Sequence, residues 1–322
     1  MAQHWIAPGF VGIDGLELVD VDVPAPGHGE VTIEVRAAGV GPADWKYVSP
    51  EFAHASPKTS FPATIGTEVS GVITAIGPAT QLATGGGAVG EEVLAFRVPD
   101  GFATSVTVPA KDVFAKPATL SFEQAAGLLA VGVTAVDMIR TSGVQAGDAV
   151  LVHGASGSVG VLLLQLLRDD GVTTIGTASA RNRILVESFG ATWVPYGDGL
   201  ADRVRAVGAV QAAYDCVGTD EAIDVSVELL RESGADTDRF VTIANSRRAR
   251  AEGLTFIAGS LPDHAAFRDS VRADVIAKAA AGDVVLPLGP SFPLTEAKEA
   301  LRLLKGGHPG GKVTLHPTTV LP

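Results

Sequence analysis

Short apolar runs bounded by glycine and proline fill the chain from about residue 16 to residue 116. Runs of this length with turn residues on both sides are typical of strands. Their close spacing predicts a mostly β, barrel-like domain. The predicted strands include Glu30–Ala37, Glu68–Ile76, Glu92–Phe96 and Ala103–Val108.

From Ser121 the pattern changes, because helix-sized segments now alternate with single apolar strands. Six such strands predict an α/β fold with a doubly wound parallel sheet. The tail then holds an amphipathic stretch, a short strand, a helix and a closing strand. The six sheet strands are Ala149–His153, Thr173–Ala178, Thr192–Tyr196, Ala212–Val217, Phe240–Ala244 and Thr255–Ala258; the tail segments are Ala265–Ala281, Val284–Leu288, Leu294–Leu304 and Lys312–Leu315.

A glycine-rich turn follows the first of these six strands. Gly154, Gly157 and Gly160 are spaced by three and three, and an apolar helix over Val159–Leu167 is predicted after them. The first glycine permits a sharp turn, the second admits a pyrophosphate against bare backbone, and the third lets the helix approach the sheet. The helix would aim its free N–H groups at the phosphates. A plain tight turn is the alternative, and the flanking strand and helix favour the nucleotide site.

Composition narrows the class of protein. The 322 residues suggest about two domains, and 46% hydrophobic residues supply a large core. A net charge of −12 argues against nucleic acid or an anionic membrane as the partner. We find no apolar run of about 18 residues and expect no membrane-spanning helix. Cys216 is the only cysteine, which indicates a reducing cytoplasm. Because Cys216 lies in an apolar run, we expect it to be a buried core residue.

Seven blocks of sequence, in order, resemble one known family. They are Ala38–Lys46, Gly66–Gly77, Ser121–Ala126, Gly132–Ala135, His153–Gly160, Phe189–Ala191 and Gly311–Leu315. The chain is similar to the zinc-free, quinone-oxidoreductase-like branch of the medium-chain dehydrogenase/reductase superfamily, which includes zeta-crystallin. The resemblance covers nearly the whole length and is far more specific for the fold than for the substrate.

This resemblance implies a domain division and a site. A GroES-like substrate domain would span residues 1–120, an NADP-binding Rossmann domain 121–262, and a C-terminal segment 263–322 would return to complete the barrel. The active site would lie in the cleft between the domains, and the protein would be a homodimer.

The same blocks lack the zinc ligands of the alcohol dehydrogenases in this superfamily. The positions that match the ligands are Gly41, Thr67 and Ala130, which offer no usual zinc ligand. A four-cysteine zinc lobe is impossible with one cysteine, and the seven histidines show no ligand spacing. We therefore expect no metal, and without a Lewis acid simple alcohol oxidation is disfavoured.

The cofactor expected from the sequence is NADPH. About 20 residues past the turn, an NAD-binding fold usually places an acidic residue, and here Ser179, Arg181 and Arg183 stand instead. A hydroxyl and guanidinium groups suit a 2′-phosphate, although both arginines could be solvated residues at a helix start. The resemblance adds Tyr196 at the adenosine phosphate, and Thr134 and Asn245 at the nicotinamide. From the turn itself the expected contacts are Gly154, Ser156, Gly157, Ser158, Val159 and Gly160.

The substrate pocket is expected along the loop 39–49. Relatives commonly have Asn at the position of Gly41, so the pocket is expected to be larger here and quinone preference is in doubt. Lys46 and Tyr47 are the candidate proton donors, and Phe52 and Phe96 the candidate apolar walls, with core packing as the alternative for each. For Asp44 and Glu68 a structural role is favoured over catalysis. A solvated loop is favoured for the basic run 247–250 over contact with the cofactor.

Two classes of function remain open. The first is an NADPH-dependent, zinc-independent reductase of quinones or α,β-unsaturated carbonyl compounds. No catalytic triad, cysteine nucleophile or acid pair can be placed from sequence, as expected when a cofactor carries the chemistry. The second is a non-catalytic NADPH-binding redox sensor or structural protein. In either class the partner is a small molecule, with no nucleic acid and no membrane.

Overall fold

The chain divides into two compact units, described here from a computed structural model that covers residues 1–55, 60–307 and 309–317. The first unit comprises Met1–Ala130 and Pro287–Pro322, and the second comprises Val131–Leu286. The segment that rejoins the first unit therefore starts at Pro287, compared with the expected residue 263.

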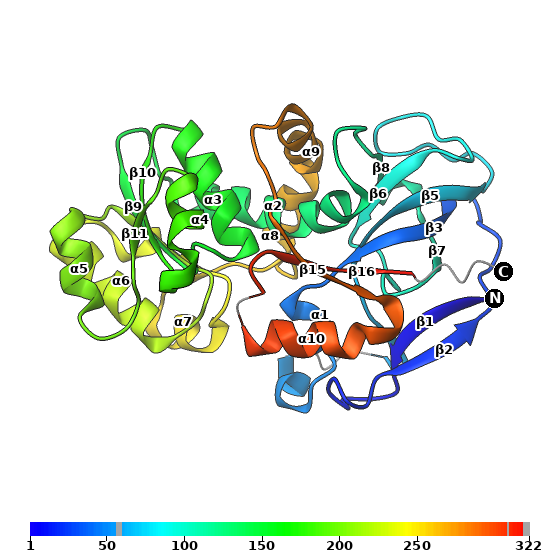
Figure 1. Cartoon of the computed structure of the whole chain (residues 1–322), viewed down its shortest axis with the longest axis horizontal. Helices are drawn as coiled ribbons and strands as arrows, with labels where there is room; N and C mark the ends of the chain where they lie inside the picture. Colours follow the sequence, from blue (N-terminus) through cyan, green and yellow to red (C-terminus); the bar gives the residue numbers. More distant parts are fainter. Residues whose placement is uncertain (56–59, 308, 318–322) are drawn as a thin grey trace. The chain divides into compact units, whose positions relative to one another are not determined.

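The first unit is mostly β-sheet (Figure 1). A three-stranded sheet runs in the order β2-β1-β4, and a seven-stranded sheet in the order β15-β16-β3-β5-β6-β8, with β7 also paired to β3. Buried valine and isoleucine side chains from these strands form one core. The strands are β1 Ala2–Ala7, β2 Glu17–Val21, β3 Glu30–Gly39, β4 Ala63–Thr64, β5 Glu68–Ile76, β6 Glu92–Phe96, β7 Ser105–Pro109, β8 Val113–Ala115, β15 Leu288–Pro293 and β16 Lys312–His316.

The C-terminal tail completes this unit, as the resemblance implied. Strand β16 pairs antiparallel with β3, with Thr314 opposite Gly39, and β15 pairs parallel with β16. Between β15 and β16, helix α10 (Ala297–Gly306) buries Ala297, Ala300 and Leu301 in the core. The predicted helix Leu294–Leu304 begins instead with a 3₁₀ turn over Leu294–Glu296.

The second unit is the predicted doubly wound sheet. Its six parallel strands follow the order β11-β10-β9-β12-β13-β14. Successive strands are added on one side of β9 up to β11 and on its other side from β12 onward, so the strand order reverses between β9 and β12. Ligands of such sheets bind outside the carboxyl ends of the strands at this reversal. The strands are β9 Ala149–His153, β10 Thr173–Thr177, β11 Thr192–Val194, β12 Ala212–Asp215, β13 Phe240–Thr242 and β14 Thr255–Phe256; the helices between them are α3 Ser158–Asp169, α4 Arg183–Ser188, α5 Leu200–Val207, α6 Asp220–Glu232 and α7 Ser246–Glu252 (Figure 1).

Packing against helix α2 (Phe122–Ser142) keeps residues 263–286 in the second unit. A Cβ atom on Gly132 would lie 2.5 Å from Val275 Cγ1, so helix α9 (Arg272–Ala281) sits directly against α2. Asp137 of α2 is fully buried and accepts hydrogen bonds from His264 and Arg268 of helix α8 (Pro262–Ser270). The expected stretch Ala265–Ala281 therefore forms two helices tied to α2.

Helix α2 is long and apolar enough to span a membrane, contrary to the expectation that no segment would be. Its 21 residues meet that test by length and composition, although Glu123, Asp137 and Arg140 interrupt the apolar run. Two thirds of its most apolar window (67%) is buried inside the structure. Core helices of soluble proteins have this environment, and the apolar surface of α2 is accounted for by packing.

Candidate functional site

The glycine turn joins β9 to α3 with the geometry that the spacing predicted. Gly154 has a φ of +74°, which favours glycine, and the Gly157 amide donates to the Gly154 carbonyl at 2.9 Å. A Cβ atom on Gly160 would lie 2.3 Å from that carbonyl oxygen, so only glycine permits this approach of α3. Gly157 is the N-cap, and no described side chain caps the helix. The first-turn amides are thus available to an anion.

A second polar group lies at the end of the neighbouring strand β10. Ser179 Oγ is buried and has no hydrogen-bond partner among the residues that the structure describes. An unpaired buried hydroxyl is costly unless a ligand or water completes it. Asn182 donates from Nδ2 to Ser156 Oγ at 3.0 Å, which joins the loop after β10 to the glycine turn. The sequence analysis missed Asn182, because nothing in its spacing marks it.

The two predicted arginines of this loop differ in their surroundings. Arg183 donates to Glu187 Oε1 at 2.8 Å on helix α4, and its guanidinium lies 5.2 Å from the Trp193 ring centroid. Arg181 is exposed in the 3₁₀ turn 180–182 and forms no ion pair with any described residue. Arg181 is therefore the arginine that is free to meet a phosphate, whereas Arg183 is occupied within the fold.

Tyr196 lies in a loop that an unpredicted arginine holds in place. The tyrosine is 49% exposed and follows β11. Arg203 of α5 donates to the Pro195 carbonyl at 2.8 and 3.1 Å, to that of Gly197 at 2.9 Å and to that of Asp198 at 2.7 Å. The guanidinium thus fixes the backbone on both sides of Tyr196. Sequence reasoning missed Arg203 because it contacts carbonyl groups, which leave no mark in the sequence.

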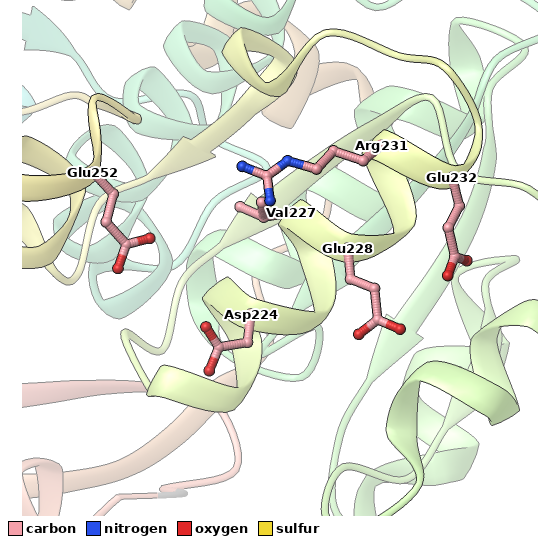
Figure 2. A pocket seen from close by; sticks show the side chains of 6 residues that line it. All are labelled: Asp224, Val227, Glu228, Arg231, Glu232 and Glu252. Atoms are coloured by element: carbon pink, nitrogen blue, oxygen red, sulfur yellow. The ribbon is translucent and has the colours of Figure 1, made fainter.

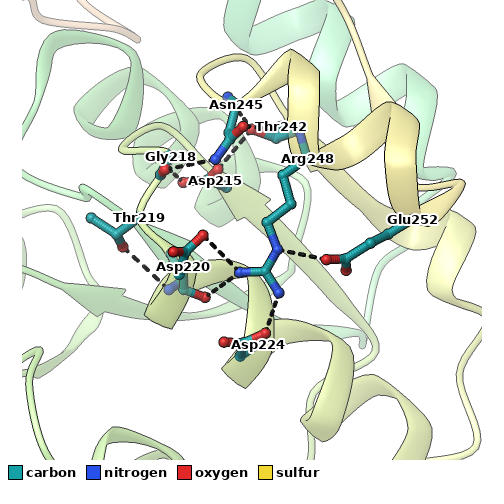
Figure 3. A network of polar contacts seen from close by, with 10 residues as sticks. Asp215, Gly218, Thr219, Asp220, Asp224, Thr242, Asn245, Arg248 and Glu252 are labelled. Carbon is teal, nitrogen blue, oxygen red and sulfur yellow. Dashed lines mark hydrogen bonds and ion pairs between the residues drawn. The ribbon is translucent and has the colours of Figure 1, made fainter.

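Asn245 sits in a polar network beyond β12 and β13 (Figure 3). Buried Asp215 accepts from the Val217 and Gly218 amides at 2.9 and 2.7 Å and from Thr242 Oγ1 at 2.7 Å. Asn245 donates to the Gly218 carbonyl at 3.1 Å and caps α7 by accepting from an amide of that helix at 3.0 Å. Both ends of the Asn245 amide are therefore used within the fold, and its role toward a nicotinamide stays a prediction.

The basic run 247–250 is helical, which corrects the expectation of a solvated loop. It lies in α7, where the Asn245 cap starts the helix. Figure 3 shows Arg248 reaching carboxylates on two helices: Asp220 at 3.0 Å, Asp224, and Glu252 at 2.6 Å. Arg248 is thus a structural tie between α6 and α7.

Other polar groups of this sheet are structural by their surroundings. His153 ends β9, is buried, and bonds Ser226 Oγ at 3.0 Å; burial lowers the pKa of its imidazole to about 4. Cys216 is half-buried, not fully buried as expected, and burial of its sulfur raises the pKa of the thiol. Thr134, a predicted cofactor contact, lies buried in α2.

A groove of about 400 Å³ on this unit is a poor site for a phosphate ligand. Figure 2 shows its lining on α6 and α7, where carboxylates dominate. Such a surface repels a phosphate group. The lining residues are Asp224, Val227, Glu228, Arg231, Glu232 and Glu252, none of which was a predicted site residue.

Four of the predicted substrate residues lie in or beside the short helix α1 (Pro42–Lys46). Gly41 is its N-cap and its amide donates to Asp44 Oδ2 at 2.7 Å. Lys46 Nζ lies 5.7 Å from the Phe52 ring centroid, and burial lowers the pKa of its ammonium group. Tyr47 is 52% exposed and Phe96 is half-buried at the end of β6. The structure brings Lys46 and Phe52 together; contact of these residues with a substrate stays a prediction.

Comparisons with known proteins agree with this architecture. Residues 27–118 match the family described as alcohol dehydrogenase GroES-like domain, and residues 189–315 match the family described as zinc-binding dehydrogenase. The rat quinone oxidoreductase is 31% identical over 233 residues, covering 71% of this chain and 66% of the relative. This chain belongs to the quinone-oxidoreductase-like branch of the medium-chain dehydrogenase/reductase superfamily.

Further relatives of the family carry different names. The mouse synaptic vesicle membrane protein VAT-1 homolog is 35% identical over 191 residues, 58% of this chain, and the match spans only 45% of that protein. An NADPH-dependent alkenal/one oxidoreductase of Arabidopsis thaliana chloroplasts is 29% identical across 98% of this chain and 79% of its own. A mycobacterial protein solved in complex with NADPH is 28% identical and superposes with a TM-score of 0.83, covering 98% of this chain and all of that one.

The residues of this chain do not fit the zinc that one family description implies. At the positions that match the ligands stand Gly41, Thr67 and Ala130, none of which is a usual zinc ligand. Within the described part of the chain, no group of three His, Cys, Asp or Glu side chains is placed to hold a metal ion.

Proposed function

We propose that this protein is an NADPH-dependent oxidoreductase that reduces quinones or α,β-unsaturated carbonyl compounds without a metal ion. The observation that carries the proposal is the pairing of the open glycine turn with the unsatisfied Ser179 hydroxyl and the free Arg181 guanidinium. A turn that cradles a pyrophosphate, followed one strand later by donors for a further phosphate, matches the two phosphate groups on the adenosine ribose of NADPH, the 5′-pyrophosphate and the 2′-phosphate.

Each of these groups has a distinct task when the cofactor binds. The amides at the start of α3 would hold the pyrophosphate, while Ser179 and Arg181 would hold the 2′-phosphate and Tyr196 would lie against the adenosine. NADPH supplies a hydride from nicotinamide C4. The named relatives support this assignment, since one is called NADPH-dependent and another is solved with NADPH.

The α1 region would meet the acceptor. A conjugated carbonyl group suits a metal-free site, because negative charge that develops on its oxygen can be met by a single donor. Lys46, whose ammonium pKa is lowered by burial, and the exposed Tyr47 are the candidate donors, and the Phe52 and Phe96 rings the candidate apolar walls. A positioned proton donor typically contributes about 10²- to 10⁴-fold in rate.

The test is the consumption of NADPH with quinones, enones and enals in parallel, with and without a chelator. We expect turnover with at least one acceptor class and no effect of the chelator. Tight NADPH binding without turnover on any acceptor would instead favour the non-catalytic sensor or structural role. Stoichiometric zinc with chelator-sensitive turnover would contradict the metal-free chemistry.

Gly41 offers a test of acceptor size. A Cβ atom there would meet only Asp44 Oδ2, at an ordinary 3.6 Å, and the φ of −133° suits any residue. Gly41→Asn should therefore fold normally and narrow the acceptor range toward small quinones, as kcat/KM over a size series would show. Gly27→Asn, in an exposed turn, is the control. An unchanged size profile in Gly41→Asn would remove Gly41 from the pocket.

Two features rest on the resemblance and the composition alone. A homodimer and a cytoplasmic location are proposed on that basis. Sedimentation of the purified protein and fractionation of cells that express it would test them separately.

A further inference from the structure

Three ionisable side chains are buried together beside helix α1. Asp44, Glu68 and Lys312 are 5%, 3% and 3% exposed, and they come from α1, β5 and β16. Glu68 accepts a hydrogen bond from the Lys312 ammonium group and another from the Ala130 amide at 3.2 Å. Lys312 is thus already engaged by the Glu68 carboxylate, and no cation of the described residues forms an ion pair with the Asp44 carboxyl group.

Backbone amides, not a cation, provide the hydrogen bonds of the Asp44 carboxyl group. This carboxyl group accepts from the Gly41 amide at 2.7 Å, and the Gly66 amide also donates to it. Burial raises the pKa of this carboxyl group to about 7, the Glu68 carboxylate acts in the same direction, and the Gly41 amide and Lys312 oppose both. The carboxyl group therefore changes charge near neutral pH.

In the part of the chain that the structure describes, the other charged side chains near α1 form no hydrogen bond or ion pair with the Asp44 carboxyl group. Lys46 of the same helix and Lys305 of α10 both turn to the Trp45 ring, with Nζ at 5.9 and 4.8 Å from its centroid. Glu51 pairs with Lys305 at 3.4 Å. Lys312 and Glu68 thus remain the charges that face Asp44 from the strands packed against it.

The hydrogen bond from the Gly41 amide to the Asp44 carboxyl group fixes the backbone at the N-terminus of α1. A carboxylate accepts an amide hydrogen bond more strongly than a neutral acid does. The same short helix carries Lys46, and Tyr47 directly follows it. A change of charge on this carboxyl group is therefore transmitted by one hydrogen bond to the residues expected to meet the acceptor.

We propose that Asp44 is a positioning residue of the substrate site, and that the gain or loss of one proton on its carboxyl group changes how firmly α1 holds Gly41, Lys46 and Tyr47. The proton exchanges with solvent, and no other bond forms or breaks. The inference rests on the proposed function only in taking these residues as the acceptor site.

Trp45, next to Asp44 in the chain, reports the change without any turnover. Its indole Nε1 is buried and has no hydrogen-bond partner among the described residues. In protein labelled with ¹⁵N-tryptophan, the indole signals of Trp5, Trp45 and Trp193 are assigned by single Phe variants and followed from about pH 5.5 to about pH 9, without NADPH or acceptor. We expect the Trp45 signal to titrate with a midpoint near the Asp44 pKa of about 7.

Two isosteric variants make the assignment specific. Asp44→Asn should leave the Trp45 signal flat across this range, because it keeps the shape and removes the titration. Glu68→Gln should lower the midpoint, because it removes a like charge and frees Lys312 to pair with Asp44. The signal of Trp5, which is buried in the core of the same unit, checks that each variant is folded. A Trp45 signal that does not titrate, or that titrates equally in Asp44→Asn, overturns the proposal.

Kinetics with an accepted substrate separate positioning from a merely structural role. The acceptor KM should change about fivefold across the titration in the native protein, the effect of strengthening one hydrogen bond, while the NADPH Kd stays constant. Asp44→Asn should abolish that change. An acceptor KM that keeps its pH dependence in Asp44→Asn contradicts the proposal. Absence of turnover on every acceptor would refute the proposed function alone, since the tryptophan titration is measured without it.

Discussion

At the scale of single residues, two neighbouring arginines divide into one that is free and one that is occupied. Arg183 is held by Glu187 at 2.8 Å and lies over the Trp193 ring, whereas Arg181 forms no ion pair with a described residue. Positive charges at the N-terminus of a helix are repelled by the positive end of the helix dipole. The pair with Glu187 offsets that cost for Arg183, and a bound phosphate would offset it for Arg181.

Replacing each arginine by alanine should therefore have different effects. Arg181→Ala should weaken NADPH binding about tenfold to a hundredfold, because a hydrogen bond to a charged group contributes about 1.5–3 kcal/mol. Binding of NADH, which lacks the 2′-phosphate, should hardly change. Titration calorimetry with both cofactors measures this.

The matched control is Arg183→Ala, which should alter NADPH affinity less than Arg181→Ala does. An equal loss of NADPH and NADH binding in Arg181→Ala would show that this arginine does not read the 2′-phosphate. A larger loss in Arg183→Ala would mean that the ion pair with Glu187 opens when the cofactor binds.

Residue type and spacing predicted some of this site and could not predict the rest. Gly154, Gly157 and Gly160 were found because their role depends on a missing side chain, which the sequence states directly. Asn182 and Arg203 were missed because their partners, Ser156 Oγ and three backbone carbonyl groups, come together only in the folded loops. Asp44 and Glu68 were expected to be structural, but their shared burial with Lys312 depends on the return of β16.

At the scale of elements, the contact between α3 and the glycine turn depends on two glycines for different reasons. A Cβ atom on Gly160 would lie 2.3 Å from the Gly154 carbonyl oxygen, a backbone atom that cannot give way. A Cβ atom on Gly157 would lie 3.3 Å from the same oxygen, a tight contact that a small shift relieves. Gly160 thus serves packing, and Gly157 is the glycine that we expect to serve the approach of the ligand.

The alanine variants should separate these two roles. Gly160→Ala should lower the free energy of unfolding by about 1–3 kcal/mol through overpacking and weaken the binding of both dinucleotides. Gly157→Ala should leave stability within about 1 kcal/mol of the native value and still weaken binding, because the new methyl group stands where the pyrophosphate would lie. Urea unfolding and cofactor titration measure the two effects. Equal stability loss in both variants would contradict the division of roles.

The strands were the most predictable elements. Three strands were predicted with the correct first and last residues, because their apolar patterns stop at turn residues. They are β5 (Glu68–Ile76), β6 (Glu92–Phe96) and β9 (Ala149–His153). The region 247–250 was misjudged because the Asn245 cap and the acidic partners of Arg248 outweigh a repulsive local charge run. The position of residues 263–286 was set by the fit of Val275 against Gly132, which no local pattern expresses.

At the scale of the whole molecule, buried His153 links stability to pH. Burial lowers the pKa of its imidazole to about 4, below the ordinary value of about 6.5 in the unfolded chain. Between these two pKa values the unfolded state binds more protons than the folded state. The contribution of His153 to the free energy of unfolding is therefore fully present above about pH 6.5 and is lost as the pH falls toward 4. Lowering the pH from about 7 to about 5 should cost on the order of 1–2 kcal/mol from this group.

His153→Gln should flatten this part of the stability profile, measured as the free energy of urea unfolding at both pH values. The variant keeps a hydrogen-bonding group near Ser226 and removes the titration. His28→Gln, at an exposed histidine, is the control and should keep the native pH dependence. If the two variants lose equal stability on acidification, His153 is not the linked group.

We expect NADPH bound at the glycine turn to transfer a hydride to a conjugated acceptor. The most direct test uses NADPH in which both hydrogens at nicotinamide C4 are replaced by deuterium, with mass analysis of the reduced enone and kinetic isotope effects for quinones, whose hydroxyl label exchanges. We expect one deuterium on the carbon that accepted the hydride, with the same yield in the presence of a chelator. A reduced enone that carries no deuterium, or NADPH that remains unoxidised with every acceptor, would contradict this expectation.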